Sequence, residues 1–168
     1  VMLPIISQIV NLSLSTGCFP SVYKEAQIKP LIKSKTLDPE LLNSYRPVSN
    51  LSYISKVIET AMNNQILDHF SSNNLLSAFQ SAYRRGHGVE STITHVYSSI
   101  LKQLDKGHHV FLILLDLSAA FDTISHSQLL LKLQSNFNIT GLALKLIQSY
   151  LTGRTTKVRI HSSLSSSM

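Results

Sequence analysis

The sequence predicts a helix-rich α+β fold with a small antiparallel sheet. Two stretches, 52–70 and 89–104, repeat apolar residues at intervals of three and four, the spacing of one face of an α-helix. Two shorter runs have the length of strands: 110–115 is wholly apolar, and 157–160 alternates. Because helices and strands follow each other without a regular strand–helix–strand period, a parallel α/β fold is not expected.

The first 23 residues carry no charge and predict a helix that ends at Gly17. Polar residues and prolines interrupt the segment, so it is too polar to span a membrane, and a signal peptide would need a basic start. We expect a buried amphipathic helix and no membrane segment. Because the chain begins with Val1 and ends in a serine-rich run, we also expect that both ends are cut.

The segments that follow predict strands, turns and further helices in order. The run 26–32 is strand-like, Asp38 and Pro39 open a turn, and Arg46 is extended because a residue before proline avoids the α region. Residues 80–88 form a basic loop with two glycines, and the helix after it stops at Gly107. A capping box at 125–128 starts one more helix, and 141–151 has the apolar spacing of another.

Composition narrows the class of protein. The chain has 168 residues, of which 43% are hydrophobic and 14% charged, which predicts one folded domain and not a disordered chain. Lys and Arg number 15 against 9 Asp and Glu, and this basic balance favours an anionic partner without identifying it. The single cysteine, Cys18, excludes an internal disulfide and a cysteine-based zinc cluster.

Asp116 is the main candidate for chemistry, because it directly follows the apolar run 110–115. A carboxylate there needs a partner, and a divalent cation with oxygen ligands is one such partner. Capping of the next turn by the same carboxylate is an equally good interpretation. Asp122 follows six residues later, and for it a structural hydrogen bond is at least as good an explanation as a metal site.

The cations form three groups that suit phosphate contacts, although a single one is more often a solvated surface charge. They are Lys24/Lys29/Lys33/Lys35, Arg46 with Arg84/Arg85, and Lys145/Arg154/Lys157/Arg159. The seven histidines form no ligand pattern, and Cys18 has no histidine nearby in the sequence, so neither predicts a metal or nucleophilic site.

Three sequence blocks, in this order, resemble a reverse transcriptase of the non-LTR (LINE-like) retrotransposon type. They are Arg46-Pro-Val-Ser-Asn-Leu, Gln80-Ser-Ala-Tyr-Arg-Arg-Gly-His, and Phe111-Leu-Ile-Leu-Leu-Asp-Leu-Ser-Ala-Ala-Phe-Asp122. Phe19-Pro20 and 29–33 upstream, and 149–154 downstream, fit the same family. The resemblance implies a right-hand polymerase, with fingers over 1–105 and the start of the palm over 106–168.

The resemblance also implies roles for individual residues. Asp116, with the Leu117 carbonyl, would bind two Mg²⁺ ions as the first catalytic carboxylate, and Phe121 would exclude a ribose 2′-hydroxyl. Arg46 and Lys33 would hold the incoming nucleotide together with Leu117 and Phe121. Gln80, Arg84, Arg85 and Gly86 would contact the template. Asp122 matches a family residue to which no metal role is given.

The implied partners are an RNA template, a DNA primer, deoxynucleoside triphosphates and the rest of a parent polyprotein, with no membrane. Nuclear action would suit target-primed integration, although no localisation motif is visible. The chain departs from the family at 88–90, at Leu146 and at Thr156, and it holds no Asp or Glu after Asp122. Since the family's Pro-Gln-Gly and Tyr/Phe-x-Asp-Asp blocks are absent, we expect no polymerase activity from these residues alone.

Two alternatives stay open at this point. The same fold could be a remnant that binds RNA or an RNA–DNA hybrid without catalysis, and the downstream reading frame would separate the two. A phosphohydrolase that uses Asp116 as a nucleophile is less well supported, because Ser118 stands where that chemistry usually needs a second carboxylate.

Overall fold

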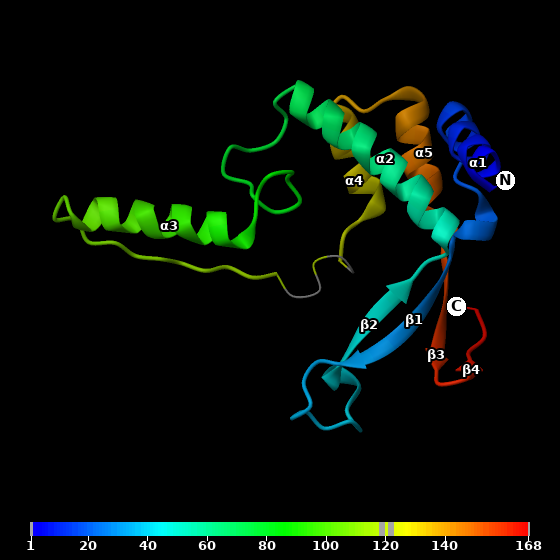
Figure 1. Ribbon diagram of the computed structural model, residues 1–168, viewed down its shortest axis with the longest axis horizontal. Helices are drawn as coiled ribbons and strands as arrows, with labels where there is room; N and C mark the ends of the chain where they lie inside the picture. Colours follow the sequence, from blue (N-terminus) through cyan, green and yellow to red (C-terminus); the bar gives the residue numbers. More distant parts are fainter. Residues whose placement is uncertain (1, 118–119, 121–122, 168) are drawn as a thin grey trace. The chain divides into compact units, whose positions relative to one another are not determined.

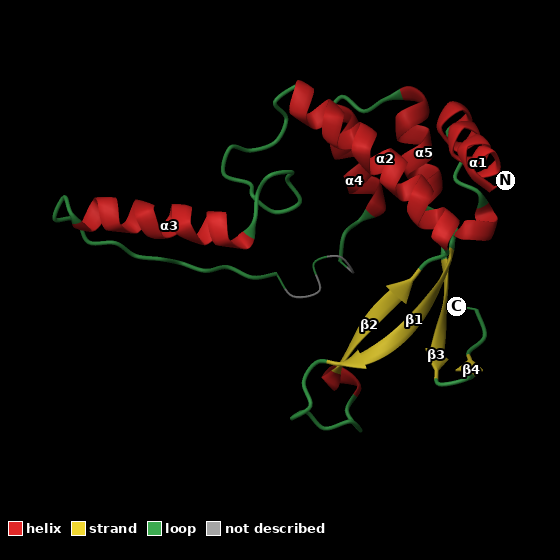
Figure 2. Cartoon of the chain, viewed as in Figure 1, coloured by secondary structure: helices red, strands yellow, loops and turns green. Residues whose placement is uncertain are grey.

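The computed structural model describes residues 2–117, 120 and 123–167. Contacts divide the chain into two compact units, Val1–His69 with Ser125–Met168, and Phe70–Ile124. The α+β prediction is confirmed, because the described residues form five α-helices and one four-stranded sheet (Figure 2). We call the first unit the sheet unit, since it holds all four strands, and the second the loop unit.

Four helices belong to the sheet unit, and each confirms a prediction from the sequence (Figure 1). They are α1 (Met2–Thr16), α2 (Tyr53–Ser72), α4 (His126–Ser135) and α5 (Gly141–Leu151). The predicted cap of α4 is present, since the Ser125 hydroxyl accepts a hydrogen bond from the Gln128 backbone N–H. The buried core of this unit takes side chains from several elements: Ile58 on α2 is fully buried, Leu146 on α5 is 4% exposed, and Ala26 on β1 is also 4% exposed.

The helix predicted at the N-terminus is confirmed as α1, but the prediction that it is buried is wrong. Ser13 is its only buried side chain among the described residues, whereas Leu3 and Leu12 are more than half exposed. The reason is that the main contact of α1 among the described elements is with α5, which covers one stripe of its surface. No described helix is both long and apolar enough to cross a membrane.

The sheet has the order β2-β1-β3-β4 and a mixed topology. Its strands are β1 (Glu25–Ile32), β2 (Tyr45–Asn50), β3 (Thr155–Ile160) and β4 (Ser163–Leu164). The antiparallel pairs are β1 with β2 and β3 with β4, as expected, but β1 and β3 run parallel. The parallel pair brings together two segments that are far apart in the sequence. Between β1 and β3 the chain forms α2, α4, α5 and the loop unit.

Gly17 ends α1 in the left-handed conformation that its position after the helix predicts, with φ of +66°. A Cβ atom at this position would lie 3.0 Å from the Leu142 carbonyl oxygen on α5. The Lys145 ammonium donates a hydrogen bond to the Thr16 carbonyl at 3.2 Å, so it stabilises the same helix end. Gly17 therefore permits both the turn and the close approach of α1 to α5.

We expect Gly17→Ala to lower the free energy of unfolding by about 1–3 kcal/mol, because alanine adds a strained φ and a clash with backbone. Gly153→Ala is the matched control, since Gly153 has φ of +65° but no atom within 4 Å of the added Cβ. Urea unfolding of both variants checks the prediction. An equal loss in the two variants would contradict the role of the Leu142 contact.

The loop unit contains α3 (Val89–Leu104), which confirms the helix predicted there, and Gly107 follows it with φ of +75°. The strand predicted at 110–115 is wrong. These residues form no regular structure, and Phe111, Ile113 and Leu115 are 78–92% exposed. Apolarity alone does not make a strand, because a strand also needs a hydrogen-bonding neighbour, and β1–β4 pair only with one another in the described part of the chain.

Candidate functional site

The structure places Arg46 and Lys33, the predicted nucleotide contacts, at one end of the β1–β2 hairpin. Arg46 lies on β2 opposite Leu31 and is exposed. Lys33 follows β1; its backbone N–H donates to the Ser44 carbonyl at 2.8 Å, and its ammonium donates to the Asn43 carbonyl at 2.7 Å. The hairpin thus brings both cations together, with the Lys33 ammonium already engaged in one hydrogen bond.

The predicted template contacts lie in a tight loop of the loop unit. The Gln80 side chain donates a hydrogen bond to the Ala82 carbonyl at 3.2 Å, and the Arg84 guanidinium donates to the Ser77 carbonyl at 3.1 Å. Gly86 has φ of +78°, a conformation that glycine adopts without strain. Arg84 therefore stabilises the loop itself, whereas Arg85 is exposed and forms no hydrogen bond or ion pair with any described residue.

The predicted catalytic carboxylate, Asp116, lies in the exposed segment 111–117 of the loop unit, which has no regular secondary structure. Leu117, whose carbonyl is the second predicted metal ligand, is 80% exposed. Phe121 and Asp122 lie outside the described residues. Within the described ranges, no group of three or more His, Cys, Asp or Glu side chains is arranged to hold a metal ion.

Asp116 and the Leu117 carbonyl fit Mg²⁺ in the kind of atom they offer, because Mg²⁺ prefers oxygen ligands and commonly uses one or two carboxylates with substrate phosphates. They do not make a complete site, since no group of three or more His, Cys, Asp or Glu side chains among the described residues could hold a metal ion. Asp116 and the Leu117 carbonyl offer two oxygen ligands, which by themselves do not make a complete Mg²⁺ site.

A cluster that the sequence did not predict joins α2, α5 and the start of β3. The Arg154 guanidinium lies 3.9 Å from the Glu59 carboxylate and 4.5 Å from the centre of the Tyr150 ring, and it donates to the Tyr150 carbonyl. The Ser55 hydroxyl donates to Glu59 at 3.2 Å. Burial is the main reason why the pKa of Tyr150 is raised; the Glu59 charge and hydrogen bond add to it, and Arg154 opposes them.

The prediction that Arg154 belongs with the phosphate-binding cations is therefore wrong, because its guanidinium contacts Glu59 and Tyr150 within the fold. Two other cations of those groups bind carbonyls at helix ends: Lys145 at the end of α1, and Lys24 at the end of α5 through the Thr152 carbonyl at 3.0 Å. The sequence could not predict these hydrogen bonds, because each lysine lies more than 120 positions away from the carbonyl that it binds.

The raised pKa of Tyr150 predicts a loss of stability in alkali. Above pH ~10 an unfolded tyrosine ionises while Tyr150 in the folded chain stays protonated, so the free energy of unfolding falls as the pH rises toward the pKa of the folded form. Tyr150→Phe removes this contribution, and we expect its stability to fall less steeply over that range. Urea unfolding between neutral and alkaline pH measures the slope, and an unchanged slope would contradict the effect.

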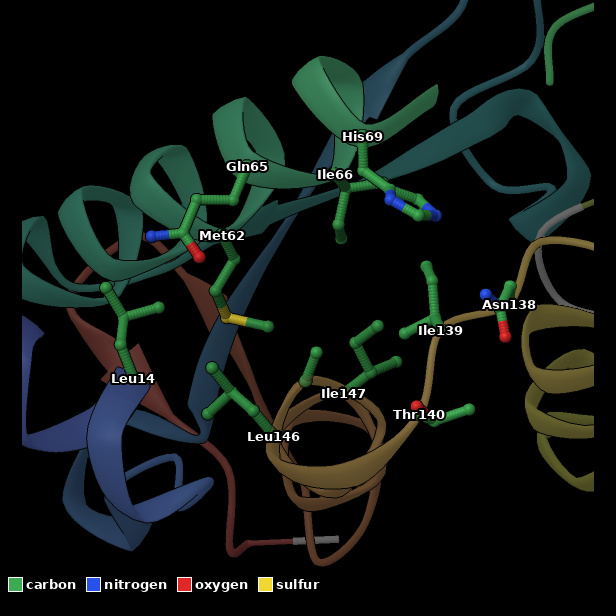
Figure 3. Close-up of a pocket in the computed structure, with 11 residues that line it drawn as sticks. Leu14, Met62, Gln65, Ile66, His69, Asn138, Ile139, Thr140, Leu146 and Ile147 are labelled. Atoms are coloured by element: carbon green, nitrogen blue, oxygen red, sulfur yellow. The ribbon is translucent and has the colours of Figure 1, made fainter. Parts of the chain in front are cut away.

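A pocket of about 320 Å³ lies in the sheet unit between α1, α2 and α5 (Figure 3). Leu14, Met62 and Leu146 point into it, and Gln65, His69 and Thr140 form its polar wall. The His69 ring hydrogen-bonds the Phe137 carbonyl at 2.7 Å. Because no Lys or Arg lines this pocket, it lacks the positive charge that a nucleotide triphosphate needs.

Comparison with protein families gives a match to the reverse transcriptase (RNA-dependent DNA polymerase) family over residues 32–167. The match covers Lys33, strand β2 with Arg46, and the segment with Asp116. The chain belongs to this family. The resemblance drawn from the sequence blocks is thereby confirmed, and the family is one of nucleotidyltransferases that generally depend on a metal.

Similar proteins come from mobile elements of flies. The chain is 29% identical over 157 residues to a probable RNA-directed DNA polymerase from transposon BS of Drosophila melanogaster, covering 94% of this chain and 17% of that protein. It is 31% identical over 146 residues to the RNA-directed DNA polymerase from mobile element jockey of Drosophila funebris, covering 87% and 16%. It is 33% identical over 122 residues to a probable polymerase from transposon X-element, covering 73% and 13%.

These relatives confirm the expected retrotransposon type of reverse transcriptase. The chain spans 13–17% of the length of the three relatives, so it corresponds to a small part of each.

Proposed function

We propose that the chain binds template and nucleotide as part of an RNA-directed DNA polymerase of a retrotransposon, with residues 1–105 as fingers and 106–168 as the start of the palm. The observation that carries this proposal is the family match over 32–167, which contains the blocks around Arg46, Gln80 and Asp116 in order. The partners are an RNA template, a DNA primer, a deoxynucleoside triphosphate and the rest of a longer polyprotein.

The guanidinium of Arg46 is exposed and bonds to no described residue, which supports a role in holding the triphosphate, because a planar fork of donors suits phosphate oxygens. Lys33 at the same hairpin end adds a second positive charge. Leu117 and Phe121 would border the nucleotide, and Phe121 would exclude a ribose 2′-hydroxyl. Gln80, Arg84, Arg85 and Gly86 would contact the template, with Arg84 and Gly86 shaping the loop that presents Arg85.

Asp116 and the Leu117 carbonyl would hold Mg²⁺ in the parent protein, together with carboxylates other than those described here. When bound, a pair of such ions activates an attacking hydroxyl and stabilises a leaving phosphate. The contribution of this chain would be one charged ligand and one neutral ligand. The exposure of residues 111–117 leaves both accessible to a substrate.

Charge reversal at Arg85 tests the template contact, since Arg85 does not hold its own loop together. We expect Arg85→Glu to weaken binding of an RNA–DNA template–primer by roughly tenfold, or about 1.4 kcal/mol. The slope of log affinity against log salt concentration should become shallower by about one unit, because one phosphate contact is lost. Fluorescence anisotropy over a series of salt concentrations measures both quantities.

Lys102→Glu is the matched control, because Lys102 is an exposed cation on α3 of the same unit and the change in charge is identical. Equal effects of the two substitutions would show that only net charge matters and would remove Arg85 from the template site.

A further inference from the structure

All the charged residues of the sheet lie on one of its faces. Partners in the register share a face, and Lys29 pairs with Val48, Leu31 with Arg46, and Gln27 with Lys157. Arg159 comes two residues after Lys157 and is therefore on that face, as is Glu25. The alternate positions of the four described strands carry no charge, so this basic face has four cations and one carboxylate.

Three of these cations are free to bind a ligand. Lys29, Arg46 and Arg159 are exposed, and none of them forms a hydrogen bond or ion pair through its side chain with a described residue. Lys157 is paired with Glu25 at 2.7 Å, which neutralises part of its charge. The basic face thus differs from Arg154, Lys145 and Lys24, whose cations are used within the fold.

The three longest strands each contribute to the charge. Adjacent strands lie about 4.8 Å apart, and successive residues on one face of a strand lie about 6.6 Å apart. β1 supplies Lys29, β2 supplies Arg46, and β3 supplies Lys157 and Arg159. Half-exposed Leu31 and Val48 lie between them, so the surface is a broad strip and not a single-ion pocket. A chain of phosphates is the partner whose repeated negative charge matches such a strip.

We propose that the basic face, through Lys29 and Arg159 beside Arg46, binds the phosphate backbone of the RNA template. This surface belongs to the sheet unit and is additional to the template loop at 80–86. The inference rests on the proposed function, since that function supplies the template. Glu25 limits the affinity, because its carboxylate occupies Lys157 and repels phosphate.

The test compares single substitutions in the full chain for binding of a short single-stranded RNA. We expect Lys29→Gln and Arg159→Gln each to weaken binding by several-fold. Each should also make the slope of log affinity against log salt concentration shallower by about one unit. Glu25→Gln should strengthen binding, because it frees Lys157. The control is Lys56→Gln, an exposed cation on α2 of the same unit, which should bind as the unsubstituted chain does. Thermal unfolding verifies that each variant is folded.

Each outcome bears on the inference. Weaker binding in both cation variants with stronger binding in Glu25→Gln supports it. If the unsubstituted chain binds RNA but the cation variants match Lys56→Gln, the inference is overturned while the proposed function stands. If the cation variants lose deoxynucleoside triphosphate as much as RNA, the face binds nucleotide and the inference is also overturned. If the unsubstituted chain binds neither RNA nor template–primer, both are overturned.

Discussion

Replacing Ile58 by alanine is expected to lower the free energy of unfolding by about 2–5 kcal/mol, the range for truncating a buried isoleucine. Ile58 lies on α2 and is 0% exposed, so it belongs to the buried core of the sheet unit. Removal of its side chain loses the transfer free energy of three carbons and leaves a cavity in the buried interior of the sheet unit. Urea unfolding followed by circular dichroism measures the loss.

Ile5→Ala provides the control for Ile58→Ala, because Ile5 is 57% exposed on α1 of the same unit. The chemical change is identical, so the difference between the two variants reports burial alone. We expect Ile5→Ala to cost well under half as much. Equal losses would contradict the assignment of Ile58 to the buried core.

The second large effect concerns catalysis: we expect the isolated 168 residues to incorporate no deoxynucleotide into a primer in the presence of Mg²⁺. Asp116 is a single exposed carboxylate, and the described residues assemble no group of three metal ligands. One carboxylate and one carbonyl leave the charge of two divalent ions poorly compensated, so the ions would not be held in a reactive geometry.

A primer-extension assay on an RNA template checks this expectation, with an intact reverse transcriptase as the positive control. Incorporation that depends on Mg²⁺ and is lost in Asp116→Asn would contradict it, because a complete metal site would then have to exist within the chain. Absence of incorporation together with retained template binding is the result that the proposed role predicts.

Local rules predicted most of the elements. Gly17 and Gly107 both follow helices with positive φ, and Ser125 caps α4, because these features depend on residues a few positions apart. The segment 110–115 shows where such rules fail. Its apolar composition indicates a preference for burial, but pairing depends on strands elsewhere in the chain, and periodicity cannot show which strand has a neighbour.

The same distinction applies to the candidate site. Family resemblance identified Arg46 and Lys33, and the hairpin brings them together, but their assigned roles stay predictions. The sequence could not separate Arg154, which binds Glu59 across 95 positions, from Arg159, which is exposed five residues later. Both looked like candidate phosphate contacts, and only packing shows that one cation is used by the fold and the other is free.

The measurement that tests the central claim most directly is the affinity of the unsubstituted chain for an RNA–DNA template–primer over a range of salt concentrations. A chain that contacts the phosphate backbone through Arg85 and the basic face should bind with an affinity whose logarithm falls linearly with the logarithm of salt concentration. A slope that corresponds to several neutralised phosphates is the predicted result. No binding at low salt, or binding that does not change with salt, would contradict the account.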